Sequence, residues 1–284
     1  MIVVKKITEM KAAVKKAKAW NRTIGFVPTM GFLHEGHLSL VRGSRKSADV
    51  TIVSIFVNPL QFGPKEDFKQ YPRDVERDSQ LLERERVDYL FIPDEREMYP
   101  EGYKTTVEVA ELQDKLCGRS RPGHFKGVST VVLKLFNIVQ PDLAFFGQKD
   151  AQQAIILQKM VEDLNLNVGI RVLPIVRDRD GLALSSRNTY LDEKERRAAL
   201  VLIKSLKEAN LMFEKGERKA AAICDRMKNI IMQEPLARID YVEIVDLEEL
   251  NPVNSIDQDV LLAEAVYIGK TRLIDNIILE AKVN

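Results

Sequence analysis

The chain contains 284 residues, of which 45% are hydrophobic and 30% charged, the composition of a folded globular protein with a substantial core. At about 150 residues per domain, this length predicts two domains. The 43 basic and 42 acidic side chains leave a net charge of +1. This balance argues against a general nucleic-acid or membrane-surface binder.

The cysteines and the N-terminal segment favour a cytoplasmic location. Cys117 and Cys224 are the only cysteines and lie far apart, so we expect neither a cysteine-based zinc site nor a disulfide framework. The N-terminus lacks the apolar segment of a signal peptide. The longest uncharged stretch, residues 50–64, is too short and too polar to cross a bilayer.

The first 176 residues alternate between strand and helix patterns. Short apolar runs separated by helical segments predict a parallel sheet covered on both faces, and right-handed crossovers then give an α/β, Rossmann-like doubly wound fold. We expect strands over residues 23–28, 50–57, 88–94, 143–146 and 168–176, and helices over 8–20, after Gly36, and over 74–86, 127–139 and 150–164.

The pattern changes after Val176, which predicts a nucleotide-binding catalytic domain over residues 1–176 and a smaller α+β C-terminal lid domain over 177–284. The charges from Arg177 onward are 17 basic and 20 acidic, a net of −3 that is unsuited to gripping tRNA. In this part we expect helices over 192–213 and 218–233 and strands over 239–245, 260–268 and 273–279.

The first chemical motif, Thr29-Met-Gly-Phe-Leu-His34-Glu-Gly36-His37, lies between a predicted strand and a predicted helix. It is not a P-loop, because His and Leu stand where Lys and Ser or Thr are required. Its glycines still let the backbone approach a phosphate at a helix N-terminus. Two imidazoles at i and i+3 can donate to phosphate oxygens and, when protonated, offset charge on departing pyrophosphate.

A histidine pair on a solvated helix start is the ordinary alternative. Against it, the chain has three histidines, two of them are here, and glycines stand where a phosphate requires bare backbone. A zinc site is disfavoured, because no third ligand is near and the pattern is not His-Glu-x-x-His.

The second motif, Gly147-Gln-Lys149-Asp150, also lies between a strand and a helix. Its lysine offers a point charge to a polyphosphate at the same sheet edge. Asp150 followed by Gln153 also matches a capping box, which would explain both residues without any ligand.

The third motif, Leu184-Ser-Ser-Arg187-Asn188, follows the predicted domain boundary. Two hydroxyls and an arginine in a loop preceded by glycine can form a mobile anion clamp. An ordinary polar linker is the equally open alternative.

Two further segments carry polar side chains next to predicted strands or turns. Asn58 and Gln61 follow a buried strand, where their amides can orient a small polar substrate or merely form a turn. The segment Arg119-Ser-Arg121-Pro-Gly-His124 is either an anion-binding or a solvated loop. Its distance from Cys117 gives no particular support to a Cys–His nucleophile.

His34-Glu-Gly-His37 with Leu184-Ser-Ser-Arg187 resembles the paired motifs of the nucleotidyltransferase superfamily that includes class I aminoacyl-tRNA synthetases. More closely, the motif order over residues 23–191 resembles the pantoate–β-alanine ligase (pantothenate synthetase) family. Beyond residue 191 the resemblance rests on length and layout. The segments that carry it are Pro28-Thr-Met-Gly, His34-Glu-Gly-His, Ser54-Ile-Phe-Val-Asn-Pro-Leu-Gln-Phe, Arg121-Pro-Gly-His-Phe-Lys-Gly-Val, Phe146-Gly-Gln-Lys-Asp and Leu184-Ser-Ser-Arg-Asn.

The resemblance implies a cytoplasmic, usually homodimeric enzyme of vitamin B5 and coenzyme A synthesis. Such an enzyme joins (R)-pantoate to β-alanine through a pantoyl-adenylate, using ATP and Mg²⁺ and releasing AMP and pyrophosphate. The Mg²⁺ is expected to be bound mainly through the ATP phosphates. A loop near Gly181 is expected to close over the adenylate and exclude water.

The resemblance also implies roles for individual residues. His37 is expected to be the proton donor with His34 beside it, and Lys149, Ser185, Ser186 and Arg187 are expected to act with them in catalysis. Pantoate is expected to contact Gln61, Gln153 and Asn58, and β-alanine to contact Gln61. The expected ATP site comprises Met30, Gly31, Phe32, Leu33, His34, Glu35, Gly36, His37, Gly147, Gln148, Lys149, Asp150, Val176, Leu184, Ser185, Ser186 and Arg187.

Two departures from the family pattern leave these groups intact. The family usually has Met where Leu184 stands, a swap that conserves volume, and often an aromatic residue at Ala151. Two other functions stay open: a different adenylyl or cytidylyl transferase of the same superfamily, and a nucleotide-binding module without turnover. A tRNA-linked synthetase is disfavoured by the acidic C-terminal domain.

Overall fold

The computed structural model describes residues 1–64 and 66–281. Among these residues six strands form one sheet, all parallel, in the order β1-β4-β3-β2-β5-β6. They are β1 (Ile2–Val4), β2 (Ile24–Thr29), β3 (Val50–Ile55), β4 (Tyr89–Phe91), β5 (Leu143–Gly147) and β6 (Gly169–Leu173). The helices of this part are α1 (Ile7–Ala19), α2 (Glu35–Ser47), α3 (Val75–Arg84), α4 (Glu95–Met98), α5 (Cys117–Ser120), α6 (His124–Val139) and α7 (Ala151–Asp163).

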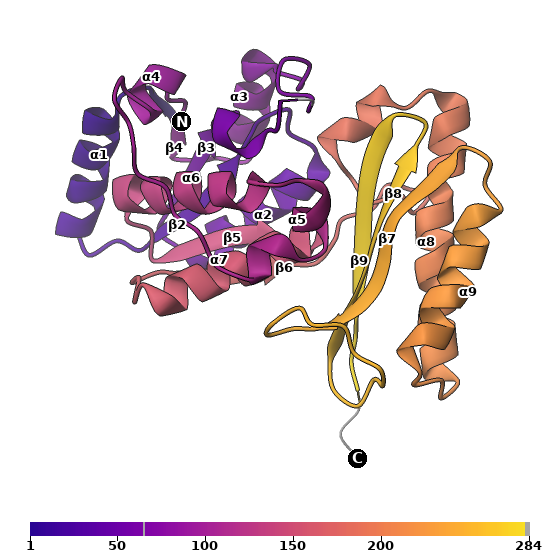
Figure 1. The fold of residues 1–284 in the computed structure, drawn as a ribbon. Coiled ribbons are helices and arrows are strands. Elements are labelled where there is room, and N and C mark those ends of the chain that lie inside the picture. The colour runs from indigo at the N-terminus through magenta and orange to yellow at the C-terminus, as the bar shows by residue number, and fades with distance from the viewer. Residues whose placement is uncertain (65, 282–284) are drawn as a thin grey trace.

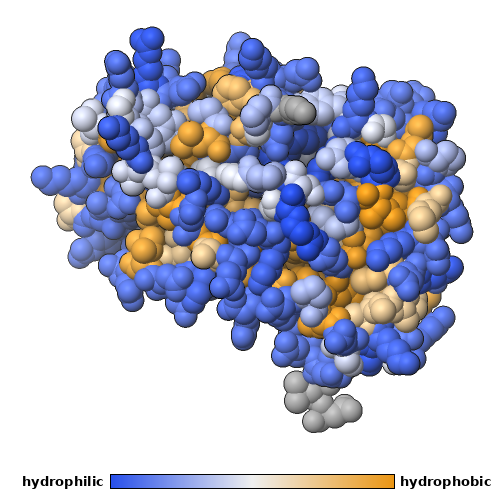
Figure 2. Space-filling model, in the orientation of Figure 1, coloured by the Kyte–Doolittle hydropathy of each residue, from blue (hydrophilic) through white to orange (hydrophobic). Residues whose placement is uncertain are grey.

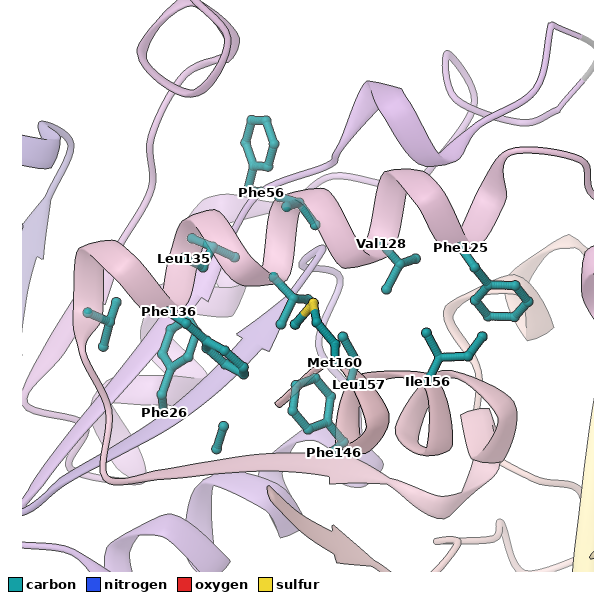
Figure 3. Close-up of a cluster of buried hydrophobic side chains, with 14 of the residues drawn as sticks. Phe26, Phe56, Phe125, Val128, Leu135, Phe136, Phe146, Ile156, Leu157 and Met160 are labelled. Carbon is teal, nitrogen blue, oxygen red and sulfur yellow. The ribbon is translucent and has the colours of Figure 1, made fainter. Parts of the chain in front are cut away.

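Both faces of this sheet are buried, which explains why its central strands are apolar throughout. Ile52 and Phe26 pack into the cluster formed with α1, α6 and α7, in which Figure 3 labels Phe26. Their chain neighbours Val27 and Val53 pack into a second cluster with α2 and α3 on the opposite face. The predicted doubly wound α/β fold is confirmed.

The strand order reverses between β2 and β5. From β2 the chain proceeds outward through β3 and β4, whereas β5 and β6 lie on the other side of β2. The β2–β5 register comprises two pairs, Gly25 with Leu143 and Phe26 with Ala144, so the strands separate toward their carboxyl ends. Ligands bind in such a crevice in open α/β sheets.

The C-terminal part contains an antiparallel sheet in the order β7-β8-β9, covered on one face by two helices (Figure 1). Val242 and Leu262 face those helices, while Tyr241 and Leu261 face the opposite way and join the core of the first sheet. One apolar cluster therefore links the two sheets. The elements are α8 (Glu193–Glu214), α9 (Ala220–Met232), β7 (Ala237–Asp246), β8 (Val260–Ile268) and β9 (Thr271–Leu279).

Every strand and helix predicted from the sequence is present, with shifts of a few residues at its ends. The short elements β1, α4 and α5 were not predicted, because three or four residues carry too little pattern. β1 pairs with β4, a partner far along the chain. The domain boundary at residue 176 stays a prediction.

The surface is mainly hydrophilic on the face shown in Figure 2, with hydrophobic residues interspersed. Within residues 1–64 and 66–281, no helix combines the length and apolar character needed to traverse a bilayer.

Candidate active site

The three chemical motifs meet at the carboxyl edge of the parallel sheet. The first follows β2, the second follows β5, and the third folds back from the C-terminal part. Together they line one cavity beside the point where the strand order reverses. Of the residues expected from the sequence, those that line it are Met30, His34, Gly36, His37, Asn58, Gln61, Gly147, Lys149, Asp150, Gln153, Val176, Leu184, Ser185, Ser186 and Arg187.

The turn after β2 has a backbone conformation that is fixed from outside the motif. Gly31 has φ +83° and Phe32 has φ +51°, and the latter is costly for a residue with a side chain. Asp78 of α3 is 1% exposed and accepts hydrogen bonds from the N–H groups of Phe32 (2.6 Å) and Leu33 (2.8 Å). This carboxylate therefore holds the loop in its strained form.

The two imidazoles of the turn cap the first turn of α2. Nδ1 of His34 accepts from the N–H of Gly36 (3.2 Å), and Nδ1 of His37 accepts from the N–H of His34 (3.3 Å). The ring centroids lie 4.1 Å apart. Because Nδ1 is an acceptor in both neutral rings, Nε2 must carry the proton. The turn thus presents two Nε2–H donors.

Burial and neighbouring positive charge keep both rings neutral. Burial, the second imidazole and Lys149 lower the pKa of His34 to about 2. Burial and Lys149 lower the pKa of His37 to about 4. At neutral pH the free protein therefore offers hydrogen-bond donors here, not imidazolium acids, and a bound polyanion would raise both pKa values.

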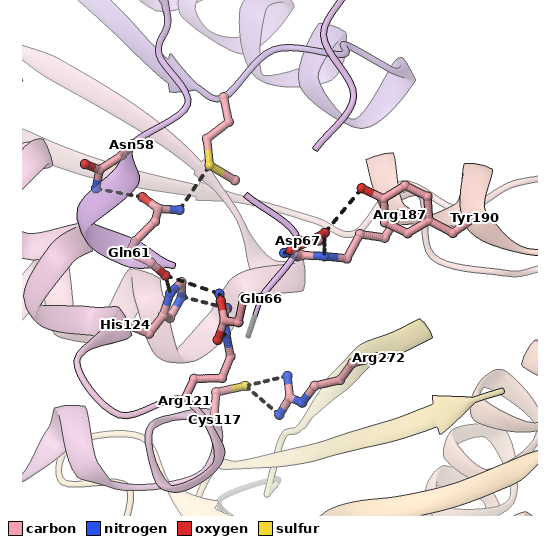
Figure 4. Close-up of polar contacts among 11 residues, drawn as sticks. Asn58, Gln61, Glu66, Asp67, Cys117, Arg121, His124, Arg187, Tyr190 and Arg272 are labelled. Atoms are coloured by element: carbon pink, nitrogen blue, oxygen red, sulfur yellow. Dashed lines mark hydrogen bonds and ion pairs between the residues drawn. The ribbon is translucent and has the colours of Figure 1, made fainter. Parts of the chain in front are cut away.

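The third motif touches the first through Ser186, whose Oγ donates to the carbonyl of Phe32 (3.2 Å). Arg187 forms a bidentate ion pair with Asp67, with Nε–O and Nη2–O distances of 2.9 and 2.8 Å. The guanidinium lies 5.9 Å from the ring of Tyr71. The cation expected to meet a phosphate is thus paired with a carboxylate of the chain (Figure 4).

Gln61 is held in place by the buried amide of Asn58. Asn58 donates to Oε1 of Gln61 (3.1 Å) and to the carbonyl of Gly127 (3.0 Å), and accepts from the N–H of Leu60 and the hydroxyl of Tyr99. All its hydrogen-bonding positions are therefore used within the protein. Asn58 lines the cavity without a free donor, and its expected contact with pantoate stays a prediction.

The loop before α6, left open by the sequence, is part of the cavity wall and not a solvated turn. Nδ1 of His124 donates to the carbonyl of Gln61 (2.8 Å), and Nε2 accepts from Arg121 (3.0 Å) (Figure 4). Arg121 also pairs with Glu66 at 2.6 Å. Cys117 does not pair with His124; its Sγ lies 3.2 Å from the hydroxyl of Tyr241.

Five residues expected in the ATP site do not line this cavity. Leu33 is buried in the core, Glu35 pairs with Arg42 outside the cavity, and the side chain of Gln148 faces β9. Gly31 and Phe32 shape the turn. In addition, Asp150 makes no capping hydrogen bond at the start of α7, so the capping-box explanation of this motif is wrong.

Sequence reasoning missed Asp67, Tyr71 and Asp78. Asp67 and Asp78 contact motif residues 120 and 45 or 46 positions away in the chain. The spacing of residues within a short motif cannot reveal partners that lie so far away in the chain. The available signal was a cluster of charged and aromatic side chains directly after Gln61, a segment that follows the carboxyl end of a central strand.

The fold and the cavity thus place paired imidazoles, a lysine and a serine–arginine loop around one crevice of a parallel sheet, the position at which open α/β sheets bind ligands.

Comparisons with known proteins then define the family. The family model for pantoate–β-alanine ligases matches residues 2–278. Pantothenate synthetase of Caldicellulosiruptor saccharolyticus is 57% identical over 280 residues, covering 99% of this chain and 100% of that one. The crystal structure of pantothenate synthetase from Thermus thermophilus has a TM-score of 0.93 at 43% identity, over 98% of this chain and 99% of that one. The chain belongs to the pantoate–β-alanine ligase family.

A third relative was solved with ligands. The pantoate–β-alanine ligase from Francisella tularensis, complexed with beta-gamma ATP and β-alanine, has a TM-score of 0.78 at 35% identity, over 98% of this chain and 97% of that one.

Proposed function

We propose that this protein catalyses the ATP-dependent ligation of (R)-pantoate and β-alanine to pantothenate through a pantoyl-adenylate, with AMP and pyrophosphate as products. The observation that carries the proposal is the single cavity into which His34, His37, Lys149 and the serine–arginine loop converge beside Gln61 and Gln153. The family and the ATP and β-alanine bound to the Francisella relative support it.

In the first step, a carboxylate oxygen of pantoate attacks the α-phosphorus of ATP, and the bond to pyrophosphate breaks. Negative charge grows on the departing pyrophosphate, so donors fixed in advance stabilise the transition state. Lys149 and Arg187 supply positive charge, and the Nε2–H groups of the two histidines supply neutral hydrogen bonds. His37 is proposed to act as a hydrogen-bond donor through its Nε2–H, the proton that its backbone contact at Nδ1 leaves on the ring.

In the second step, the neutral amine of β-alanine attacks the pantoyl carbonyl, AMP departs, and the amine loses a proton. Gln61 and Gln153 are proposed to hold pantoate, and Gln61 also faces β-alanine. Asn58 is proposed to position Gln61, because its amide donates to Oε1 of that residue and to the carbonyl of Gly127. Closure of the loop near Gly181 would exclude water from the adenylate.

Magnesium is proposed to enter with the nucleotide. In the described part of the chain no three His, Cys, Asp or Glu side chains form a metal cluster, whereas the carboxylate of Asp150 lines the cavity. This donor set fits Mg²⁺ held by one carboxylate and substrate phosphates, where the ion offsets phosphate charge. A cytoplasmic, homodimeric enzyme is part of the same proposal, supported by two buried free thiols and by the family resemblance.

An omission assay tests the function. Purified protein with ATP, Mg²⁺, pantoate and β-alanine should form pantothenate, and AMP should accumulate only with both acids present. Pyrophosphate release that does not depend on pantoate would indicate another transferase, and ATP binding without turnover would indicate a binding module.

His37→Ala should lower kcat by roughly 10²-fold, while His37→Gln, which keeps an N–H donor, should retain more activity. An unchanged kcat in the alanine variant would contradict the role of His37.

A further inference from the structure

Strand β9 of the C-terminal sheet contacts the turn that carries Lys149. Asn276 is 3% exposed, and its Nδ2 donates to the carbonyls of both Gln148 and Lys149 at 3.0 Å. Its Oδ1 accepts from Nε2 of Gln148 at 3.4 Å. A residue almost at the end of the chain is therefore bonded to the nucleotide motif after β5.

The preceding residue of β9 contacts the turn that leads into the third motif. Asp275 is 2% exposed and forms a bidentate pair with Arg177, at 2.6 and 2.9 Å. Arg177 also donates to the carbonyl of Gly181 (3.2 Å), inside the turn that leads to Ser185. Two consecutive residues of one strand thus support both motifs that carry Lys149 and Arg187.

An asparagine suits this position for a chemical reason. Its amide has two N–H donors, and the turn presents two carbonyls to it. Aspartate has the same shape but would set a carboxylate against those carbonyls. The turn also lacks a side-chain cap of its own at the start of α7. The two hydrogen bonds from Asn276, a residue distant in the sequence, therefore hold the backbone on either side of the Lys149 nitrogen in place.

We propose that Asn276 is a positioning residue for adenylate formation, acting through Lys149. The inference rests on the proposed role of Lys149 at the pyrophosphate. A cationic group that is misplaced by about 1 Å loses much of its effect on a transition state. Loss of the Asn276 amide frees the turn, so the ammonium group no longer stays where charge develops. The attack of β-alanine, which follows pyrophosphate departure, is not affected.

The experiment isolates adenylate formation, the first half-reaction, in the full-length enzyme and compares it with the KM for β-alanine in the overall reaction. Pantoate-dependent exchange of labelled pyrophosphate into ATP reports adenylate formation. Asn276→Ala should lower the exchange rate by roughly 10- to 100-fold, with KM for β-alanine within about twofold of the wild-type value. Asn276→Ser, which keeps one donor, should give an intermediate rate and serves as the second variant if the alanine variant does not fold.

A double-mutant cycle with Lys149→Ala distinguishes positioning from a general structural role. If Asn276 acts through Lys149, Asn276→Ala should change the rate of the Lys149→Ala enzyme by less than about twofold. An exchange rate at the wild-type level in Asn276→Ala, or a full additive loss in the Lys149→Ala background, would overturn the inference. Wild-type exchange in Lys149→Ala alone would instead refute the proposed role of Lys149.

Glu264→Gln is the matched control. Glu264 lies on the neighbouring strand β8, is fully buried and accepts a hydrogen bond from Ser205 on α8; it pairs in register with Asp275, so it probes the same part of the sheet without bonding to the nucleotide turn. Burial raises the pKa of its carboxyl well above the ordinary value, so glutamine replaces a neutral acid of the same shape. This variant should keep the wild-type exchange rate. A loss equal to that of Asn276→Ala would show that any polar change in this sheet disturbs the site.

Discussion

At the scale of single residues, the three histidines have two different tautomers. His34 and His37 accept backbone hydrogen bonds at Nδ1 and so carry a proton at Nε2, whereas His124 donates from Nδ1. Burial also lowers the pKa of His124, to about 3. The distinction matters chemically, because only the first two present a free N–H toward the cavity.

We therefore expect no imidazole of the free protein to titrate between pH 6 and 8. Long-range ¹H–¹⁵N spectra should show Nε2–H tautomers for His34 and His37, a Nδ1–H tautomer for His124, and raised pKa values for the first two when MgATP binds. Since these pKa values lie below that of an unfolded histidine, stability should fall as the pH decreases from about 6.5 toward 4. An imidazolium signal at pH 7 without nucleotide would contradict this assignment.

The proposed contact of Arg187 with the nucleotide makes Asp67 a competitor for that arginine. The ion pair satisfies the guanidinium in the free protein, so a triphosphate has to displace the carboxylate. Asp67→Asn should therefore lower KM for ATP about threefold to tenfold, because about 0.7–1.4 kcal/mol, the net contribution of a typical hydrogen bond, no longer opposes binding. Steady-state kinetics check this, with Glu85→Gln, whose partner Arg42 lies outside the cavity, as the control. A higher KM in Asp67→Asn would show that the carboxylate helps nucleotide binding.

At the scale of elements, the pattern of hydrophobic residues was sufficient to predict a helix or strand where the segment was long and was buried on one face or completely. The helix over residues 193–214 and the strands at 50–55 and 260–268 were predicted nearly to the residue. The rule that ligands bind at the carboxyl ends of parallel strands also placed the first two motifs together. The partners that shape these loops were not predictable, because Asp78 and Asn276 reach them from elements with no local relation to the motif.

The loop between β2 and α2 depends on α3 for its conformation. Asp78→Asn should lower the free energy of unfolding by about 2 kcal/mol, because one of two buried N–H groups would face an amide N–H₂. The same variant should raise KM for ATP, since the histidine turn would no longer be fixed. Urea unfolding and steady-state kinetics measure the two effects, and Ser79→Ala on the same helix is the control. If stability falls and KM for ATP does not change, the turn holds its shape without Asp78.

At the scale of the whole molecule, the two sheets share a core. Tyr241, Leu261 and Ala263 of the second sheet belong to the same apolar cluster as α6 and α7 of the first part. Polar contacts between the two parts reinforce this shared core, among them Ser120 of α5 with Asp240 of β7 at 2.8 Å and Arg272 of β9 with Sγ of Cys117 at 3.5 Å. The predicted lid motion should therefore be confined to loops. Movement of the whole C-terminal part would expose the shared apolar cluster to water, which is unfavourable.

The shared core predicts that both parts unfold together. Cys117 lies in the cluster that links the two sheets and Cys224 in the cluster between the second sheet and its helices, and both are buried. Pulsed thiol labelling read out by mass spectrometry should give one urea midpoint for the two cysteines. MgATP, the proposed substrate, should bind the native state and not the unfolded chain, and so raise both midpoints equally. If Cys224 became reactive at a lower urea concentration than Cys117, the C-terminal part would be an independently unfolding lid, and its support of the Lys149 turn through Asn276 would be breakable in the native enzyme.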